Sequence, residues 1–214
     1  MIVNERIRDY LRSLDRGNGE LCDAIAKDAV ASYVPIIKKE TESLLKTMVA
    51  ARRPRRILEV GTAVGYSSLL MCRVMPEDCH ITTIEKYEPR IPAARENFRK
   101  AGEEDRITLL EGDAEEILKK LEGPFDFIFM DAAKGQYIHW LPDILRLLAV
   151  GGVLFSDNVL QDGDIVESRY AVERRNRTIH SRMRDYLYTL THSDQLETSV
   201  IPLGDGVTVS VRIK

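Results

Sequence analysis

Oxygen-bearing side chains follow two of the most apolar runs in this sequence. Asp131 comes directly after the run 125–130, and Asp157 and Asn158 follow the run 153–156. Carboxylate and carboxamide oxygens are hard ligands, which suit Mg²⁺ or Ca²⁺ and bind soft metals poorly. Because Mg²⁺ keeps part of its water shell, three protein oxygens would leave positions for substrate oxygens. The alternative is that these acids only cap strands, but two acids and an Asn together disfavour it.

Lys134 stands three residues after Asp131. A lysine beside a bound cation in a buried site can have a depressed pKa and act as a general base. An exposed loop lysine explains the sequence equally well, so both interpretations stay open.

A second polar feature surrounds two glycines after the apolar run 57–60. Gly61 and Gly65 have G-x-x-x-G spacing, unlike the G-x-G-x-x-G of dinucleotide sites or the G-x-x-x-x-G-K-[ST] of P-loops. Glycine lets a ligand approach the backbone closely, and the helix that follows offers unpaired N–H groups. Glu59, within the run, suits an amine or hydroxyls better than phosphates. The alternative is an ordinary strand–turn–helix connection.

Two further acids fall at or just after the next apolar runs. Glu85 stands 24 residues after Gly61, and an acid at the end of the neighbouring strand can accept two ribose hydroxyls. A polar strand terminus is the weaker alternative. Asp113, with Ala114, lies where an adenine edge would sit. Helix N-capping by Asp113 explains this position equally well, and both roles can hold together.

These side chains meet only if strands and helices alternate to build one sheet. Apolar runs predict strands at 57–60, 80–85, 106–111, 125–131 and 153–157. Apolar periodicity and turn signals predict intervening helices at 69–75, 89–101, 116–121 and 137–148, the last stopped by Gly151-Gly152. A helix over 167–191 and a hairpin around Gly204-Asp205-Gly206 end the chain. The predicted fold is α/β, a doubly wound, mostly parallel seven-stranded sheet with an antiparallel C-terminal strand.

The N-terminal segment differs from the rest. Amphipathic patterns, beginning with Ile2, Ile7 and Leu11, predict three helices in residues 1–53. We interpret 1–53 as a helical cover and 54–214 as the core of one domain spanning 1–214, which the length of 214 residues suits.

Composition narrows the class of protein. The net charge of −3 gives no global reason to expect nucleic acid. Three cysteines without metal spacing favour a reduced, cytoplasmic setting. The start lacks a signal-peptide pattern, and no apolar run approaches membrane-spanning length, so no membrane partner is expected.

One late segment is locally basic despite the acidic total. Six arginines and a single acid, Glu173, lie between Arg169 and Arg184. The arginines considered for nucleic-acid contact are Arg174, Arg175, Arg177, Arg182 and Arg184. Arginine forks bind phosphates, and a basic cluster is typical of nucleic-acid binding. A solvated helix face is the usual alternative, which the acidic background weakens without removing.

Together, these motifs resemble the cation-dependent class I O-methyltransferases, the group that includes the catechol and caffeoyl-CoA enzymes. The motifs that carry this resemblance are ILEVGTAVGYS at 57–67, MDAAK at 130–134 and SDN at 156–158, followed by PLGDG at 202–206. The resemblance runs from about residue 30 to the C-terminus. It implies a Rossmann-like methyltransferase fold and suggests a homodimer.

The resemblance also implies a cofactor and residue roles. S-adenosylmethionine would bind with its methionine end at Glu59, Gly61, Gly65 and Ser67, its ribose at Glu85, and its adenine at Asp113 and Ala114, with Ile37 and Asp131 beside it. Asp131, Asp157 and Asn158 would hold Mg²⁺, which lowers the pKa of the acceptor hydroxyl, and Asp131 and Lys134 would be catalytic, Lys134 as the base. Ala132-Ala133 replace the bulky His-Trp of the catechol enzyme, which implies a more open pocket.

The segment RRNRTIHSRM at 174–183 resembles the bacterial tRNA 5-hydroxyuridine methyltransferases. This resemblance implies methylation of the wobble uridine's 5-hydroxyl in the tRNA anticodon region, giving 5-methoxyuridine. One alternative is a small-molecule O-methyltransferase acting on catechol-like vicinal oxygens. Others are a non-enzymatic nucleotide- or RNA-binding protein and a dinucleotide oxidoreductase, which the glycine spacing disfavours.

Overall fold

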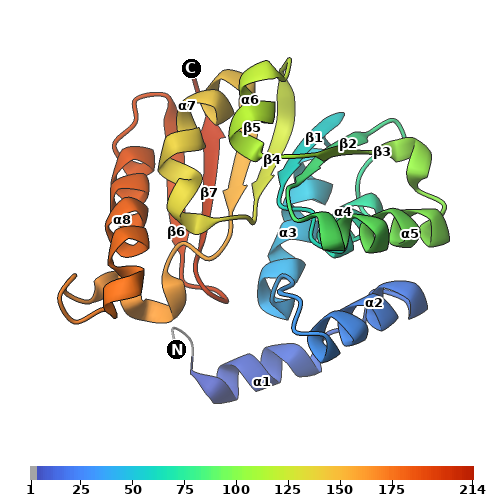
Figure 1. Ribbon diagram of the computed structural model, residues 1–214, viewed down its shortest axis with the longest axis horizontal. Coiled ribbons are helices and arrows are strands. Elements are labelled where there is room, and N and C mark those ends of the chain that lie inside the picture. Colours follow the sequence, from blue (N-terminus) through green and yellow to red (C-terminus); the bar gives the residue numbers. More distant parts are fainter. Residues whose placement is uncertain (1–3) are drawn as a thin grey trace.

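One seven-stranded sheet forms the centre of the molecule, with strand order β3-β2-β1-β4-β5-β7-β6 (Figure 1). The computed structural model describes residues 4–214, so Ile2 of the predicted first helix lies outside the described residues. The strands are β1 (Arg56–Val60), β2 (His80–Glu85), β3 (Ile107–Glu111), β4 (Phe125–Met130), β5 (Leu148–Ser156), β6 (Leu196–Ile201) and β7 (Val207–Arg212). Strands β1 to β5 pair in parallel, and β7 is antiparallel to both neighbours. The predicted fold class is confirmed.

Helices cover both faces of this sheet (Figure 1). They are α1 (Glu5–Ser13), α2 (Glu20–Ala31), α3 (Lys39–Arg52), α4 (Tyr66–Cys72), α5 (Ile91–Ala101), α6 (Ala114–Lys120), α7 (Tyr137–Leu147) and α8 (Arg177–Thr191). Helices α3, α4 and α5 lie on one face and α6, α7 and α8 on the other. None of the helices between residues 4 and 214 is long and apolar enough to cross a membrane.

Apolar side chains on both faces of the central strands explain why the sheet is buried. Leu58, Ile128 and Leu154 belong to the apolar cluster with α6 to α8, whereas Ile57 and Phe127 belong to the cluster on the opposite face. Near-continuous apolar runs are typical of parallel strands that are covered on both sides. The sheet therefore holds its carboxyl-end loops on a rigid base.

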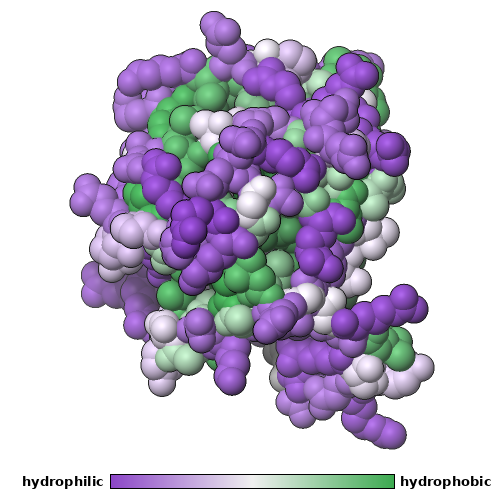
Figure 2. All heavy atoms as spheres, turned by 90° about the vertical axis from the view of Figure 1, so that its right-hand side faces the viewer, coloured by the Kyte–Doolittle hydropathy of each residue, from purple (hydrophilic) through white to green (hydrophobic). Residues whose placement is uncertain are grey.

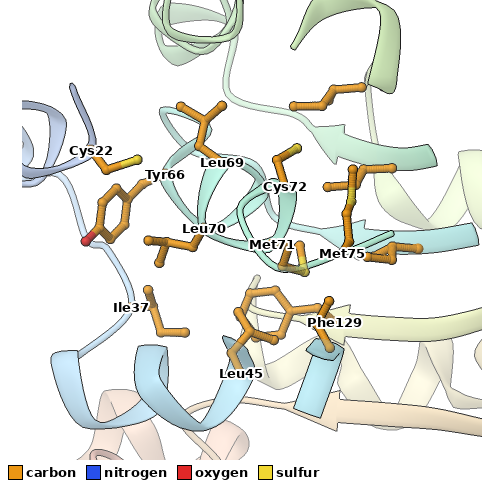
Figure 3. Packing of buried hydrophobic residues seen from close by; sticks show 14 of the residues in the cluster. Cys22, Ile37, Leu45, Tyr66, Leu69, Leu70, Met71, Cys72, Met75 and Phe129 are labelled. Carbon is orange, nitrogen blue, oxygen red and sulfur yellow. The ribbon is translucent and has the colours of Figure 1, made fainter. Parts of the chain in front are cut away.

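Helix α4 is buried around its whole circumference because other elements enclose it. All seven of its residues are buried. Side chains from α2, α3 and the segment before α3 surround it, as Cys22, Leu45 and Ile37 do around Tyr66 and Leu70 (Figure 3). The turn that precedes α4 is thereby fixed from behind.

A buried polar cluster fastens the N-terminal helices to α4. The Glu42 carboxylate accepts hydrogen bonds from the Tyr66 hydroxyl at 2.8 Å and from Asn18 Nδ2 at 2.5 Å, and Lys46 lies 3.5 Å away. A buried carboxylate is tolerated when donors and a cation satisfy it.

The molecular surface is polar by contrast: the side of the molecule shown in Figure 2 is mostly hydrophilic, with hydrophobic side chains between the polar ones.

Three predicted elements have wrong boundaries. The helix predicted over 167–191 begins only at Arg177, because residues 161–176 form a loop with two short 3₁₀ turns, η4 (Gln161–Val166) and η5 (Arg174–Asn176). Asp162 and Gly163 have positive φ there, which ends helical geometry. The strand predicted from 153 begins at Leu148, whose pairing with Phe125 carries Gly151-Gly152 into β5. Helix α4 spans Tyr66–Cys72, not the predicted 69–75.

Candidate functional site

A cavity of about 860 Å³ opens at the carboxyl ends of the parallel strands. Most residues predicted to bind cofactor or cation line it: Ile37, Gly61, Ser67, Glu85, Asp113, Ala114, Asp131, Lys134, Asp157 and Asn158. The cavity thus has two halves. One lies around Glu85 and Ala114, and the other, which we call the acidic half, lies around Asp131 and Asp157. Glu59 and Gly65 are not among the lining residues.

Gly61 allows β1 and β4 to end close together. Its φ is 108°, and a Cβ added there would lie 2.2 Å from the Asp131 carbonyl oxygen. Gly65 is required for a different reason. Its φ is 80°, and a Cβ added there would lie 2.4 Å from the Phe98 ring. The first glycine shapes the cavity wall and the second packs α5 against the turn.

Glu59 lies behind the residues that line the cavity, and its predicted contact with the cofactor stays a prediction. Its carboxylate is fully enclosed and accepts hydrogen bonds from Ser67 Oγ and Thr83 Oγ1, both at 2.5 Å, and from Ser68 Oγ. Burial raises the pKa of Glu59 to about 7, against the effect of these three donors. Glu59 orients Ser67, which does reach the cavity.

Glu85 presents a carboxylate that backbone donors hold in place. Its oxygens accept from the N–H groups of Ala63 at 2.7 Å, Lys86 at 2.9 Å and Tyr87 at 2.7 Å. Ala63 adopts φ 47°, an uncommon conformation for a non-glycine residue, to bring its N–H into this position. Since each carboxylate oxygen can accept more than one hydrogen bond, capacity remains for two vicinal hydroxyls.

Asp113 caps α6, as one of its two predicted roles requires. Its carboxylate accepts from the Glu115 N–H at 2.9 Å and pairs with Lys86 Nζ at 2.6 Å. These partners, the Lys86 hydrogen bond first, lower the pKa of Asp113. Ala114, the first residue of α6, is buried and places a small apolar side chain at the cavity wall.

Asp131 and Asp157 stand side by side because β4 and β5 pair in register up to their last residues. Met130 lies opposite Ser156, and the Asp157 N–H donates to the Met130 carbonyl at 2.9 Å. Burial raises the pKa of both carboxyls, and repulsion between them raises that of Asp157 further. The charge of Lys134, which lines the same cavity, lowers both pKa values.

Tyr137, which sequence reasoning missed, braces these strand ends. Its buried hydroxyl donates to the Met130 carbonyl and accepts from the Ala132 N–H, each at 3.1 Å. The signal available in the sequence was weak, because Tyr137 read as an ordinary residue at the start of a helix. Lys38, Trp140 and Asp205 also line the cavity without having been predicted to.

The donor set fits a hard divalent cation. No group of three or more His, Cys, Asp or Glu side chains arranged for a metal occurs among the described residues, and the predicted set differs in kind, since it is two aspartates and an asparagine. Two neighbouring buried carboxylates with raised pKa values gain from a positive charge between them. Asn158 adds a neutral carboxamide oxygen of the type that Mg²⁺ and Ca²⁺ accept.

The five predicted nucleic-acid arginines lie outside the cavity, and most already have partners. Arg175 pairs with Glu173 at 2.7 Å. Arg177 donates to the Val172 and Tyr170 carbonyls, Arg182 to the Gly135 carbonyl at 3.1 Å and Arg184 to the Glu167 carbonyl at 3.5 Å. They therefore hold the 161–176 loop and the Lys134 loop against α8. Arg174 is exposed.

Comparison with known proteins gives one consistent family. A sequence model described as O-methyltransferase matches residues 18–213. A caffeoyl-CoA O-methyltransferase of Populus kitakamiensis is 33% identical over 190 residues, covering 84% of this chain and 78% of that protein.

Solved structures agree with this result. A putative caffeoyl-CoA O-methyltransferase of Staphylococcus aureus has a TM-score of 0.88 at 29% identity, covering 95% of this chain and 98% of that one. The O-methyltransferase TomG of Streptomyces achromogenes, in complex with SAM, has a TM-score of 0.85 at 25% identity, covering 98% and 96%. With the strand order, the cavity and the acidic strand ends already in place, the family match is decisive: this chain belongs to the O-methyltransferases.

Proposed function

We propose that this enzyme transfers the methyl group of S-adenosylmethionine to the 5-hydroxyl of 5-hydroxyuridine at the wobble position of tRNA, with Mg²⁺ as the cation. The methyl-transfer part of this proposal depends on one observation: a single cavity is lined by Glu85 and Ala114 and also by Asp131, Asp157 and Lys134. Support for the donor comes from TomG, a relative by structure whose complex contains SAM.

The two halves of the cavity have different tasks in this proposal. Glu85, fixed by three backbone N–H groups, accepts the ribose hydroxyls, and Ala114 contacts the adenine ring. Ser67, held by Glu59, lies at the methionine end. S-adenosylmethionine supplies an electrophilic methyl group on a sulfonium. The walls align the acceptor oxygen with that methyl group, and this alignment is the main catalytic contribution of the chain.

The acidic half prepares the acceptor. Asp131, Asp157 and Asn158 would hold Mg²⁺, which supplies a positive charge that lowers the pKa of the acceptor hydroxyl. In its neutral amine form, Lys134 would accept the proton of this hydroxyl at Nζ and become the ammonium ion. The 5-hydroxyl of 5-hydroxyuridine lies next to a ring carbonyl, so the acceptor offers two neighbouring oxygens to the same site.

Support for tRNA comes from α8 and the loop before it. Arg182 reaches the Gly135 carbonyl, so the basic segment adjoins the loop that carries Lys134. Arg174 and Arg175 are exposed there, where they can meet phosphates. Ala132-Ala133 leave room for a nucleotide base beside the cation residues.

The test is methyl transfer from labelled S-adenosylmethionine to tRNA that carries 5-hydroxyuridine. We expect transfer with Mg²⁺, none with EDTA, and none to the same tRNA with unmodified uridine. Lys134→Met should reduce kcat by at least about 100-fold, the usual size of a general-base contribution. Lys120→Met is the matched control, because Lys120 is an exposed lysine of α6. Transfer that survives EDTA would contradict the role of the cation.

A second candidate is methylation of a small molecule with vicinal oxygens. The Populus kitakamiensis relative is a caffeoyl-CoA O-methyltransferase, and a cavity of about 860 Å³ can admit a phenolic acceptor. Offering caffeoyl-CoA and catechol in the same assay separates the two: methylation of these compounds with unlabelled tRNA would replace the tRNA proposal.

The homodimer implied by the resemblance stays a prediction. Helix α1 is the element we expect at such an interface, since its apolar side chains Ile7, Tyr10 and Leu11, and Leu14 just after it, are exposed.

A further inference from the structure

We infer that Asp205, in the turn between β6 and β7, is a positioning residue for the cation: it fixes the carboxamide of Asn158 so that its oxygen faces the cavity. This inference rests on the proposed function, because it concerns the cation held by Asp131, Asp157 and Asn158. It assigns a role to a residue that the sequence identified only as part of a hairpin turn.

The key contact is between two side chains from distant parts of the chain. Asn158 Nδ2 donates to Asp205 Oδ2 at 3.2 Å. A carboxamide has one donor end and one acceptor end, and a carboxylate can only accept. Asp205 therefore selects the orientation in which the Asn158 nitrogen points to it and the oxygen points away, and both residues line the cavity.

Backbone contacts hold Asp205 in the place that this role requires. The N–H groups of Leu160 and Val159 donate to the carbonyls of Asp205 at 2.9 Å and Gly206 at 3.0 Å. Gly206, with φ 87°, permits this approach, because a Cβ there would lie 2.7 Å from the Leu160 nitrogen. The β6–β7 turn and the strand end that carries Asn158 thus form one unit.

Lys38 completes the arrangement from the N-terminal side. Its ammonium group pairs with Asp205 and, at 3.1 Å, with Asp162. The Asp205 side chain is 13% exposed, so the ion pair neutralises a largely buried carboxylate. The segment before α3 therefore supports the orientation of Asn158 through Asp205.

The test measures Mn²⁺ binding, by calorimetry and by the electron paramagnetic resonance of free Mn²⁺, without any methyl transfer. Two double variants remove the ion pair and leave the net charge unchanged: Lys38→Met with Asp205→Asn, and Lys38→Met with Asp205→Ala. Only the asparagine variant keeps an oxygen that can accept from Asn158, and because its amide can also donate, it selects the orientation less strictly than the carboxylate does. We expect its Kd for Mn²⁺ within about threefold of the wild type and a Kd about 10–100-fold higher for the alanine variant, as for other outer-shell partners of metal ligands.

A third comparison shows whether Asp205 acts through Asn158. In an Asn158→Ala background, Asp205→Ala together with Lys38→Met should cause no further loss of Mn²⁺ affinity, because the group that Asp205 orients is gone. Thermal unfolding of the metal-free proteins checks that the variants are folded. If the alanine protein is not, Asp205→Ser with Lys38→Met replaces it, since a serine hydroxyl is too short to reach Asn158.

The outcomes separate this inference from the proposed function. Equal Mn²⁺ affinities in the asparagine and alanine variants, with normal binding by the wild type, would overturn the inference alone. Additive losses in the Asn158→Ala background would do the same. A wild-type protein that binds no Mn²⁺ would overturn the cation of the proposed function and the role of Asp205 with it.

Discussion

At the scale of single residues, buried acids carry the character of this site. Glu59, Asp131 and Asp157 all have raised pKa values, and burial is the first cause in each case. Glu59 differs from the other two because hydroxyl donors surround it and it does not line the cavity. Its charge state therefore affects stability more directly than chemistry.

The free energy of unfolding should record the titration of Glu59. Its folded pKa of about 7 lies above the ordinary 4.5, so the stability that its proton contributes is present below pH 4.5 and is lost as pH rises through 7. The loss is roughly 3 kcal/mol at 1.36 kcal/mol per pKa unit. Glu59→Gln should lack this part of the pH dependence in urea unfolding between pH 4.5 and 8. Parallel pH profiles for the two proteins would show that burial does not raise this pKa.

At the scale of elements, the turn after β1 decides the shape of the cavity. Gly61 brings the end of β1 against the end of β4, where Asp131 begins the acidic half of the site. Gly65 serves the packing of α5 on the same turn. The two glycines of the G-x-x-x-G motif are thus required for different structural reasons.

Gly61→Ala should destabilise the fold and open the strand ends. The cost combines left-handed backbone strain with overlap against the Asp131 carbonyl, roughly 2–5 kcal/mol in all. Gly102→Ala is the matched control: Gly102 also has positive φ, at 68°, but a Cβ there meets nothing within 4 Å. It should cost roughly 1–2 kcal/mol. Urea unfolding measures both, and equal costs would mean that β1 and β4 can separate without penalty.

At the scale of the whole molecule, charge is distributed unevenly. The chain carries a net charge of −3, so its overall field does not attract a polyanion. The six arginines from Arg169 to Arg184 form the basic region that we propose as the contact for a tRNA backbone. Three of these six arginines, Arg177, Arg182 and Arg184, donate to backbone carbonyls, and Arg175 pairs with Glu173, which leaves few of them for phosphates.

Binding of tRNA should therefore depend on salt only moderately, and on Arg174 in particular. We expect Arg174→Ala to weaken binding and to reduce the slope of log K against log salt by about 1, since one phosphate contact is lost. Arg182→Ala should impair methyl transfer in addition to tRNA binding, because it releases the Gly135 carbonyl beside Lys134. Filter binding over a range of salt concentrations measures the slope, with Lys120→Ala as the control. An unchanged slope would exclude Arg174 from the interface.

The sequence by itself determined the sheet and the position of its polar strand ends. Apolar runs of strand length, such as 125–130, leave a parallel sheet as the way to bury both faces, and the acids after those runs then share one edge. Asp131, Asp157, Asn158 and Glu85 were identified this way. Their roles in binding follow from that edge position and stay predictions.

Only the tertiary structure decided which side chains reach the cavity and which support it. Glu59 faces into the protein because residues alternate along β1, and the sequence pattern cannot show what lies behind the strand. Asp205 meets Asn158 across 47 residues, and Lys38 meets Asp205 across 167. Such contacts depend on how loops return over the sheet, and local periodicity carries no information on them. The start of α8 at Arg177 was likewise set by loop packing.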